Sequence, residues 1–563
     1  MRLGVLLLAA ALGWLACGVA AAIPPTLPSR APDVQDLVFL GDARPVHIRL
    51  HIDVNGKPFQ YVWEDYIRLL FAYLDRDGNG ILTKAEAERA PSAQQLLQMM
   101  RGNILGVDVN KSAPFSEMDV DPIDGMVTVQ KLAAYYRRLG AGPLQSISGQ
   151  ATARSEALNK VLFKHLDANN DGKLSKEELS AAASVLRRFD YDDDEMISEQ
   201  ELLPAQGSAM TAPQVVSRVT PRQANPGASF YVISPEDRVS HGLPAQLLKK
   251  YDKDKNELLS PAEIGLEQSV FDWLDVNHDG QLDAAELAKY VTGPPDIEIS
   301  AHLGRLGQKP GVQAMSKGLA PMPGVSLQPA ANGALLVTLT DEQIGIDVRP
   351  ETAPYELRTR GVRQFYMQQF QIADSEKKGY LLLSQLMGQF QFLRAIFTLA
   401  DRDGDGKLTM SELVAFLDVQ EKAIQCPTGL EIQTSGRGLF ALLDANRDGR
   451  LGLRELRTGW SRLSSWDRNH DGLIAASELP QQFHLRLGRG QANFGLGMEA
   501  MAATSASGIG PLWFRKMDRN GDGDVSPREF LGTLEDFRKI DTDGDGLIDA
   551  QEAAAAAKWF KPK

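Results

Sequence analysis

The sequence predicts a mainly α-helical protein built from repeated helix–loop–helix units, with a small β-rich portion. Three observations predict this class. Twelve-residue stretches rich in Asp, Asn and Glu recur along the chain, a distance of 23 residues separates several of them, and the apolar residues around them recur at helical spacing. Strand patterns are confined to residues 46–54, 229–233 and 293–350.

The last of these stretches, Asp541–Glu552, shows the pattern most clearly. Oxygen-bearing side chains fall at its positions 1, 3, 5, 9 and 12, glycine stands at position 6, and a branched aliphatic stands at position 8. Calcium takes about six to eight oxygens, so a short loop must point alternate side chains inward, lend the carbonyl of position 7 and close with a bidentate carboxylate. Glycine makes the bend at position 6 with the least strain. The stretch resembles the calcium loop of the EF-hand superfamily.

Ten stretches share this pattern, and eight match it in full. All ten have an aliphatic at position 8, where the resemblance implies a short β-bridge between paired loops. The two departures carry Glu195 and Glu257 in place of glycine, so we expect these loops to bind calcium more weakly. The ten loops begin at Asp75, Asp167, Asp190, Asp252, Asp275, Asp401, Asp444, Asp467, Asp518 and Asp541.

The predicted calcium ligands follow from the loop positions, beginning with the aspartate at position 1. The side chains at positions 3 and 5 are Asp77, Asn79, Asn169, Asp171, Asp192, Asp194, Asp254, Asn256, Asn277, Asp279, Asp403, Asp405, Asn446, Asp448, Asn469, Asp471, Asn520, Asp522, Asp543 and Asp545. The carbonyls at position 7 belong to Ile81, Lys173, Met196, Leu258, Gln281, Lys407, Arg450, Leu473, Asp524 and Leu547.

Positions 9 and 12 complete the predicted set. In the loops from Asp444 and Asp467, position 9 is Gly452 and Ala475, so water must complete the shell there. The other eight loops have an oxygen at position 9, on Thr83, Ser175, Ser198, Ser260, Asp283, Thr409, Ser526 and Asp549. The closing glutamates are Glu86, Glu178, Glu201, Glu263, Glu286, Glu412, Glu455, Glu478, Glu529 and Glu552.

Two further stretches keep the outline of the loop but lack ligands. After Asp119 there is one residue too many before the glycine, and Lys131 or Leu132 falls where the closing glutamate should stand. In the other stretch, Lys378 replaces a ligand and Gln385 occupies the closing position. The extra residue and missing glutamate of the first stretch, and the cation inside the shell of the second, oppose calcium, so we expect both hands to fold without the metal. We therefore predict twelve hands in six pairs of sequence neighbours, ten of them competent.

These patterns divide the chain into segments. Eleven residues separate neighbouring loops of the 23-residue repeat and span about 16 Å as helix, so the helices between them must be short or shared. The predicted segments are 1–22, a signal peptide; 23–60, a linker and β-hairpin; the six pairs at 61–140, 155–205, 241–292, 357–425, 430–482 and 512–563; 293–356, a β-rich connection; and 483–511, a Gly/Ala-rich linker.

The first 22 residues predict export. Arg2 provides a positive start, the residues up to Val19 are apolar, and three alanines follow. We expect cleavage and a secreted or periplasmic location, with an uncleaved anchor or a lipoprotein linked through Cys17 as alternatives. No later stretch is apolar for long enough to span a bilayer, so we expect no stable membrane insertion after cleavage. Without Cys17, Cys426 is the only cysteine, and no intramolecular disulfide can form.

Charge limits the partners. The chain of 563 residues has a formal net charge of −13 and no long run of Lys or Arg, which argues against nucleic acid. We expect calcium ions as the ligand and an extracellular protein or polysaccharide as a partner. In overall plan the chain resembles exported multi-EF-hand proteins of bacteria, planctomycetes among them.

The function predicted from these features is that of a secreted, non-enzymatic scaffold or interaction protein in which calcium is mainly a structural stabiliser. One alternative is a calcium sensor or buffer that exposes a binding groove. Another is an enzyme with an unrecognised site in the β-rich region, although no nucleophile elbow, Cys-x-x-Cys or zinc-protease helix motif appears. A further hypothesis is a calcium-dependent adhesion protein, which differs from the secreted scaffold only in having a binding partner.

Overall fold

The computed structural model describes residues 31–100, 113–120, 123–150, 152–204, 217–218, 229–233, 242–304, 311–315, 325–330, 333–349, 355–446, 448–490 and 510–558. The predicted signal peptide, with Cys17, lies outside these ranges, and so does most of the predicted Gly/Ala-rich linker. Within the described ranges, no helix has both the length and the apolar character needed to cross a membrane.

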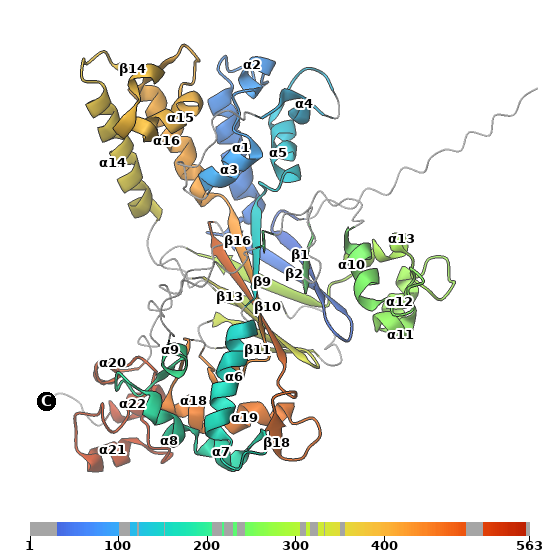
Figure 1. The fold of residues 1–563 in the computed structure, drawn as a ribbon, viewed down its shortest axis with the longest axis vertical. Helices are drawn as coiled ribbons and strands as arrows, with labels where there is room; N and C mark the ends of the chain where they lie inside the picture. The colour runs from blue at the N-terminus through green and yellow to red at the C-terminus, as the bar shows by residue number, and fades with distance from the viewer. Residues whose placement is uncertain are drawn as a thin grey trace, which may run out of the picture.

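The prediction of a mainly α-helical fold is wrong. Of the residues that the structure describes, 43% are in helices and 22% in strands. Its centre consists of one six-stranded and one seven-stranded sheet, and the helical hands surround them (Figure 1). The protein is therefore a mixed α and β fold in which a β centre carries the hands.

The six-stranded sheet has the order β10-β9-β2-β1-β8, with β3 paired to β2. Strands β1 and β2 form an antiparallel hairpin that sets Leu37 opposite Ile48, and β9 runs parallel to β2. The bounds are β1 Val34–Leu40, β2 Pro45–Val54, β3 Lys57–Pro58, β8 Phe230–Val232, β9 Ile297–Leu303 and β10 Gly311–Ala314.

The seven-stranded sheet has the order β11-β12-β13-β19-β16-β4-β7. Strand β19 runs parallel to β13 and antiparallel to β16, while β4 runs parallel to β16. The bounds are β4 Leu144–Gln150, β7 Ser217–Arg218, β11 Ser326–Pro329, β12 Leu335–Thr338, β13 Glu342–Val348, β16 Thr428–Gly436 and β19 Gln481–Arg489.

The two sheets pack face to face and share one apolar core. Phe39 of the first sheet meets Phe483 of the second with ring centroids 5.0 Å apart. The fully buried side chains of this core include Leu37, Ile48, Leu50, Ile52, Ile299, Val337, Ile344, Ile346, Leu430 and Leu485. Burying this much aliphatic surface is the main force that holds two sheets together.

The missed strands share a physical reason. Every residue of β1 is buried, so its sequence, Val-Gln-Asp-Leu-Val-Phe-Leu, lacks the alternation that marks a half-exposed strand. Strands β4, β16 and β19 each lie directly between helical hands; β4 lies between predicted segments, and β16 and β19 lie at the ends of the predicted fifth pair. Their partners come from distant parts of the chain, and local patterns do not encode such pairing.

The hands form four helical units, and two of these units combine distant segments. Unit A comprises α1 Phe59–Leu74, α2 Lys84–Ala87, α3 Ala93–Met100, α4 Phe115–Met118, α5 Val129–Arg138, α14 Tyr355–Ala373, α15 Gln391–Ala400 and α16 Met410–Gln425, which share one apolar core. Unit B comprises α6 Thr152–Leu166, α7 Lys176–Ser180, α8 Ala182–Leu186, α9 Glu199–Leu202, α17 Leu439–Leu443, α18 Leu453–Arg457 and α19 Gly459–Leu463, with a second core.

The other two units are each continuous in sequence. Unit C packs on the first sheet through Val38, Leu40 and Tyr231. It comprises α10 Gly242–Tyr251, α11 Pro261–Ile264, α12 Gln268–Leu274 and α13 Ala284–Leu287. Unit D comprises α20 Leu512–Met517, α21 Leu534–Ile540 and α22 Ala550–Ala556 around a small core of its own.

Strands β4 and β16 explain how units A and B are assembled. Each strand leaves unit A and leads into unit B, and the two run parallel as neighbours, with Leu144 opposite Thr428. Their pairing therefore brings two hands from each half of the chain together at both ends of the strands (Figure 1).

Candidate metal centres

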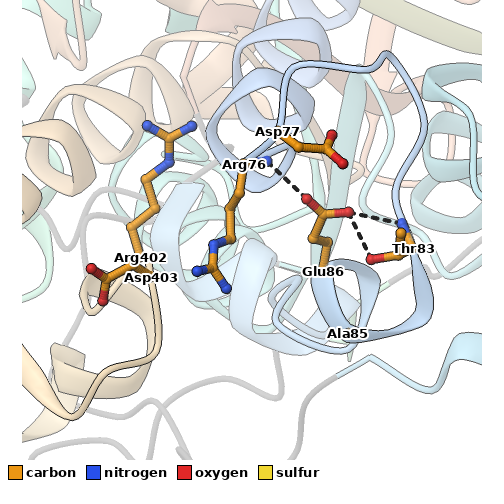
Figure 2. A pocket seen from close by; sticks show the side chains of 7 residues that line it. All are labelled: Arg76, Asp77, Thr83, Ala85, Glu86, Arg402 and Asp403. Carbon is orange, nitrogen blue, oxygen red and sulfur yellow. Dashed lines mark hydrogen bonds between the residues drawn. The ribbon is translucent and has the colours of Figure 1, made fainter.

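The loop from Asp75 to Glu86 is closed by hydrogen bonds to its first and last residues. The Asp75 carboxylate accepts the backbone N–H groups of Gly78 at 2.8 Å and Gly80 at 2.9 Å. Glu86 accepts the N–H of Arg76 at 2.9 Å through Oε1, and both the N–H and the hydroxyl of Thr83 through Oε2 (Figure 2). These bonds place the two carboxylates at the ends of the loop on a common side.

The same closure recurs along the chain. The glutamate at position 12 accepts the N–H of position 9 in all ten loops, and in nine of them it also accepts an N–H from position 2 or 3. In all ten, the position-1 aspartate accepts the N–H of position 6.

Five loops bring three carboxylate oxygens within 4.8 Å of one another. These groups are Asp75, Asp77 and Glu86; Asp190, Asp192 and Asp194; Asp252, Asp254 and Glu263; Asp401, Asp403 and Glu412; and Asp541, Asp543 and Glu552. Like charges at such distances repel one another, so the arrangement suits a cation at their centre.

The electrostatics of two predicted ligands, Asp522 and Asp194, point the same way. Burial raises the pKa of Asp522 to about 8, and burial raises that of Asp194 to about 6. Removing a carboxylate from water is unfavourable unless a cation stands beside it. The donor set consists of carboxylates, amide and hydroxyl oxygens and one carbonyl per loop, which fits a hard divalent ion such as Ca²⁺.

The two departures at position 6 adopt the backbone that glycine would adopt. Glu195 and Glu257 both have φ of +64°, close to the +81° of Gly80 in the first loop. A side chain in this left-handed region is strained by roughly 1–3 kcal/mol. Both loops nevertheless make the hydrogen bond from position 6 to position 1, so their shape is kept.

The hand after the first loop holds a lysine at its centre. Lys131 Nζ donates to Asp119 Oδ1 at 2.7 Å, to Asp124 Oδ1 at 2.6 Å and to the Met126 carbonyl at 3.0 Å. Burial works to lower the pKa of Lys131, but the hydrogen bonds to the two carboxylates outweigh it, and the pKa is raised above its ordinary value. Of the two residues that the sequence left open for the closing position, Lys131 is there, and Leu132 lies in the apolar core.

The other incomplete hand closes with an amide. Gln385 Oε1 accepts the backbone N–H of Leu382 at 2.8 Å, the bond that the closing glutamate makes to position 9 in complete loops. Lys378 forms an ion pair with Glu376 of the same loop. In both incomplete hands, a lysine therefore forms an ion pair with at least one carboxylate of its own loop.

The position-8 residues join the loops in pairs. Leu82 bridges to Val127, Leu259 to Leu282, Leu381 to Leu408 and Val525 to Ile548, as neighbours in the sequence. The second and fifth predicted pairs instead exchange partners within unit B. Leu174 on β5 (Lys173–Ser175) bridges to Ile474 on β18 (Leu473–Ala475), and Ile197 on β6 (Ile197–Ser198) bridges to Leu451 on β17 (Arg450–Leu451).

Two complete loops of unit A face each other across a hollow. The hollow has a volume of about 560 Å³ and lies between the loop from Asp75 and the loop from Asp401 (Figure 2). Arg402 crosses to the neighbouring helix and donates to the carbonyl of Tyr73 at 2.8 Å. The lining residues are Arg76, Asp77, Thr83, Ala85, Glu86, Arg402 and Asp403.

Loops also meet within unit B and between units B and D, in contacts that sequence reasoning missed. Within unit B, Arg450 pairs with the predicted ligand Asp194 at 2.9 Å. Arg454 pairs with Asp524 and with the predicted ligand Asp545, both at 2.8 Å. Both arginines belong to the loop from Asp444, but their partners lie 70 or more residues away, so no local pattern could have revealed them.

Comparison with known families agrees with the loop geometry. Six segments of the chain match the EF-hand family model, at residues 158–183, 266–291, 393–417, 437–460, 512–531 and 534–552. These segments are EF-hands, and EF-hands of this kind indicate calcium binding. A search of curated proteins finds no match to the chain, so the finer resemblance to exported bacterial proteins gains no support.

Proposed function

We propose that this chain is an exported, non-enzymatic scaffold protein in which calcium is a structural component. The observation that carries the proposal is that bridged loops and loop-to-loop contacts join distant segments of the chain. The bridges of unit B connect the loop at Asp167 with that at Asp467, and the loop at Asp190 with that at Asp444. An ion that stabilises these loops also stabilises the connection between the two halves.

The expected energy is large enough for this role. A site with a Kd of about 0.1 mM in about 1 mM calcium gains roughly 1.4 kcal/mol from binding. Ten such sites would supply about 14 kcal/mol, comparable with the stability of a whole domain. The residues that provide this energy are the ten sets of loop ligands, which we propose all to be functional.

A melting experiment tests the proposal. Thermal unfolding of the purified chain is followed in about 1 mM calcium and in excess chelator, and bound calcium is counted by native mass spectrometry. We expect a lower melting temperature in chelator and about ten bound ions in calcium. Identical transitions in the two conditions would rule out a structural role.

Export and the absence of an enzymatic activity are part of the proposal. Export is supported by the signal-peptide pattern of residues 1–22. The resemblance to exported bacterial multi-EF-hand proteins is part of the same proposal. An extracellular protein or polysaccharide is the proposed partner. Expression with the natural N-terminus in a bacterial host, followed by sequencing of the mature N-terminus from the culture medium and periplasm, tests the location.

A further inference from the structure

The loop that starts at Asp119 holds an ammonium group in the position where complete loops are built to hold calcium. Lys131 Nζ contacts two carboxylates and one backbone carbonyl at 2.6–3.0 Å, and its side chain is only 9% exposed. Its contacts are therefore mainly with protein oxygens rather than with water.

The correspondence with a complete loop can be made residue by residue. Gly125 has φ of +76° and donates to Asp119 at 2.8 Å, as position 6 donates to position 1 elsewhere. Val127 makes the position-8 bridge to Leu82. Thr128, the equivalent of position 9, accepts the N–H of Lys131, just as Ser175 accepts the N–H of its closing glutamate. This alignment places Lys131 at position 12.

The three oxygens that contact the ammonium among the described residues are then ligand groups of a calcium site. Asp119 stands at position 1, Asp124 at position 5, and the carbonyl of Met126 at position 7. In a complete loop these groups and the closing glutamate surround the ion. Here the glutamate is replaced by a residue whose own cation reaches the same centre.

We propose that Lys131 is a built-in substitute for calcium, which keeps this hand closed at any calcium concentration. The hand then holds its side of the bridge between Leu82 and Val127, in which each residue donates to the other's carbonyl, at 2.9 and 3.2 Å. The first loop consequently has a preformed partner, whereas in units B, C and D both members of each bridged pair carry the closing glutamate of a calcium loop. The inference extends the calcium binding proposed above but does not need calcium to be structural elsewhere.

A single substitution distinguishes the two kinds of hand. Lys131→Glu restores the closing carboxylate and removes the internal cation, so we expect it to create one additional calcium site. Lys131→Met removes the cation without supplying a ligand. Lys57→Glu is the matched control, because Lys57 carries the same charge outside every loop, is 70% exposed and forms an ion pair only with Asp65, at 4.0 Å, among the described residues.

Two measurements on the full chain test the proposal. Native mass spectrometry at saturating calcium should count one more ion in Lys131→Glu than in the wild type or in Lys57→Glu. Hydrogen exchange in chelator should show the amides of Leu82 and Val127 protected in the wild type, with exchange at least tenfold faster in both Lys131 variants. Calcium should restore protection in Lys131→Glu but not in Lys131→Met.

Three results would overturn the proposal. The first is an unchanged number of bound calcium ions in Lys131→Glu. The second is an equal rate of amide exchange at Val127 in the wild type and in Lys131→Met. The third is a wild-type Val127 amide that in chelator exchanges as freely as the Leu282 amide of unit C. If the wild-type melting temperature proved insensitive to chelator, the structural role proposed for calcium would fail, but the contrast between Lys131→Met and the wild type would remain decisive for this inference.

Discussion

Units B and C contain the same 23-residue repeat and pair their loops differently. In unit C, the loops from Asp252 and Asp275 bridge to each other through Leu259 and Leu282. In unit B, the loops from Asp167 and Asp190 are equally spaced, yet each bridges to a loop more than 250 residues away. Spacing alone therefore does not determine which loops pair.

The difference lies in the eleven residues between neighbouring loops. In unit C, α11 ends at Gly265 in the left-handed region, with φ of +67°, so the chain turns before α12 begins. In unit B, Ala181 joins α7 to α8 with a right-handed backbone, and a 3-10 turn, Arg187–Phe189, continues to the next loop. The two loops of unit B therefore stay about 16 Å apart along a nearly continuous helix. A helix breaker permits pairing of neighbours, and its absence forces exchange.

The largest expected effect is the formation of a disulfide cross-link between two bridged loops of unit B. Arg450 lies opposite Ser198 across the exchanged bridge, within the reach of a disulfide. Arg450→Cys with Ser198→Cys, in a Cys426→Ser background, should therefore oxidise to a cross-linked chain, detected by gel mobility after proteolysis. Lys173→Cys with Ser198→Cys is the matched control, because positions 7 and 9 of these loops would face each other only if neighbours paired. Efficient cross-linking in the control and none in the first variant would refute the exchange.

These observations show how far the sequence could predict the molecule. Ligands such as Asp75 and Glu86 belong to a local pattern whose chemistry dictates the spacing, so the hands could be located. The role of Gly265 could also be predicted from the sequence, because a glycine between two short helices commonly ends the first helix. The sheets were only partly accessible: β2, β8, β9 and β13 lie in the predicted strand ranges, but β1 is buried on both faces and β16 pairs with strands far away in the chain. The contacts of Arg454 depend on how these distant segments assemble, so the sequence could not predict them either.

Substitution of the turn residue should separate the two units by stability. Gly265→Ala introduces left-handed strain of roughly 1–3 kcal/mol, and the added Cβ would approach the carbonyl oxygen of Ala43 to 2.5 Å. Ala181→Gly, in the continuous segment of unit B, should destabilise by only about 0.5–1 kcal/mol. Hydrogen exchange at the Leu259 and Ile474 amides reports on the two units separately. A larger effect from Ala181→Gly would contradict the role assigned to the turn.

Calcium coupling should follow the bridges rather than the sequence. Removing the closing carboxylate with Glu478→Gln should weaken calcium binding at the bridged loop from Asp167 by about 1–2 kcal/mol, and leave the loop from Asp444 nearly unchanged. Glu286→Gln in unit C should instead weaken its sequence neighbour, the loop from Asp252.

Glycine amide signals allow each loop of unit B to be titrated separately. Gly172 donates to Asp167 at 2.8 Å and Gly449 donates to Asp444 at 2.9 Å, so each amide senses its own loop. Calcium titrations of glycine-labelled protein, with and without Glu478→Gln, then measure both affinities. If the Gly449 midpoint moved and the Gly172 midpoint did not, coupling would follow sequence order and the comparison would fail.

The smallest effect concerns the strained glutamate at loop position 6, which occurs once in unit B and once in unit C. Glu257 of unit C is exposed, so Glu257→Gly relieves left-handed strain at the expense of some unfolded-state entropy, and we expect a net gain of about 0.5–1 kcal/mol. Glu195 of unit B is only 15% exposed and lies 3.3 Å from Arg528 of unit D. Glu195→Gly loses that contact, which is worth under about 1 kcal/mol at a partly exposed site, so its gain should be close to zero.

Calorimetric melting in calcium measures both variants. Equal gains would mean that the contact with unit D contributes nothing, whereas a net loss in Glu195→Gly would show that unit B tolerates a strained loop because that loop also holds unit D.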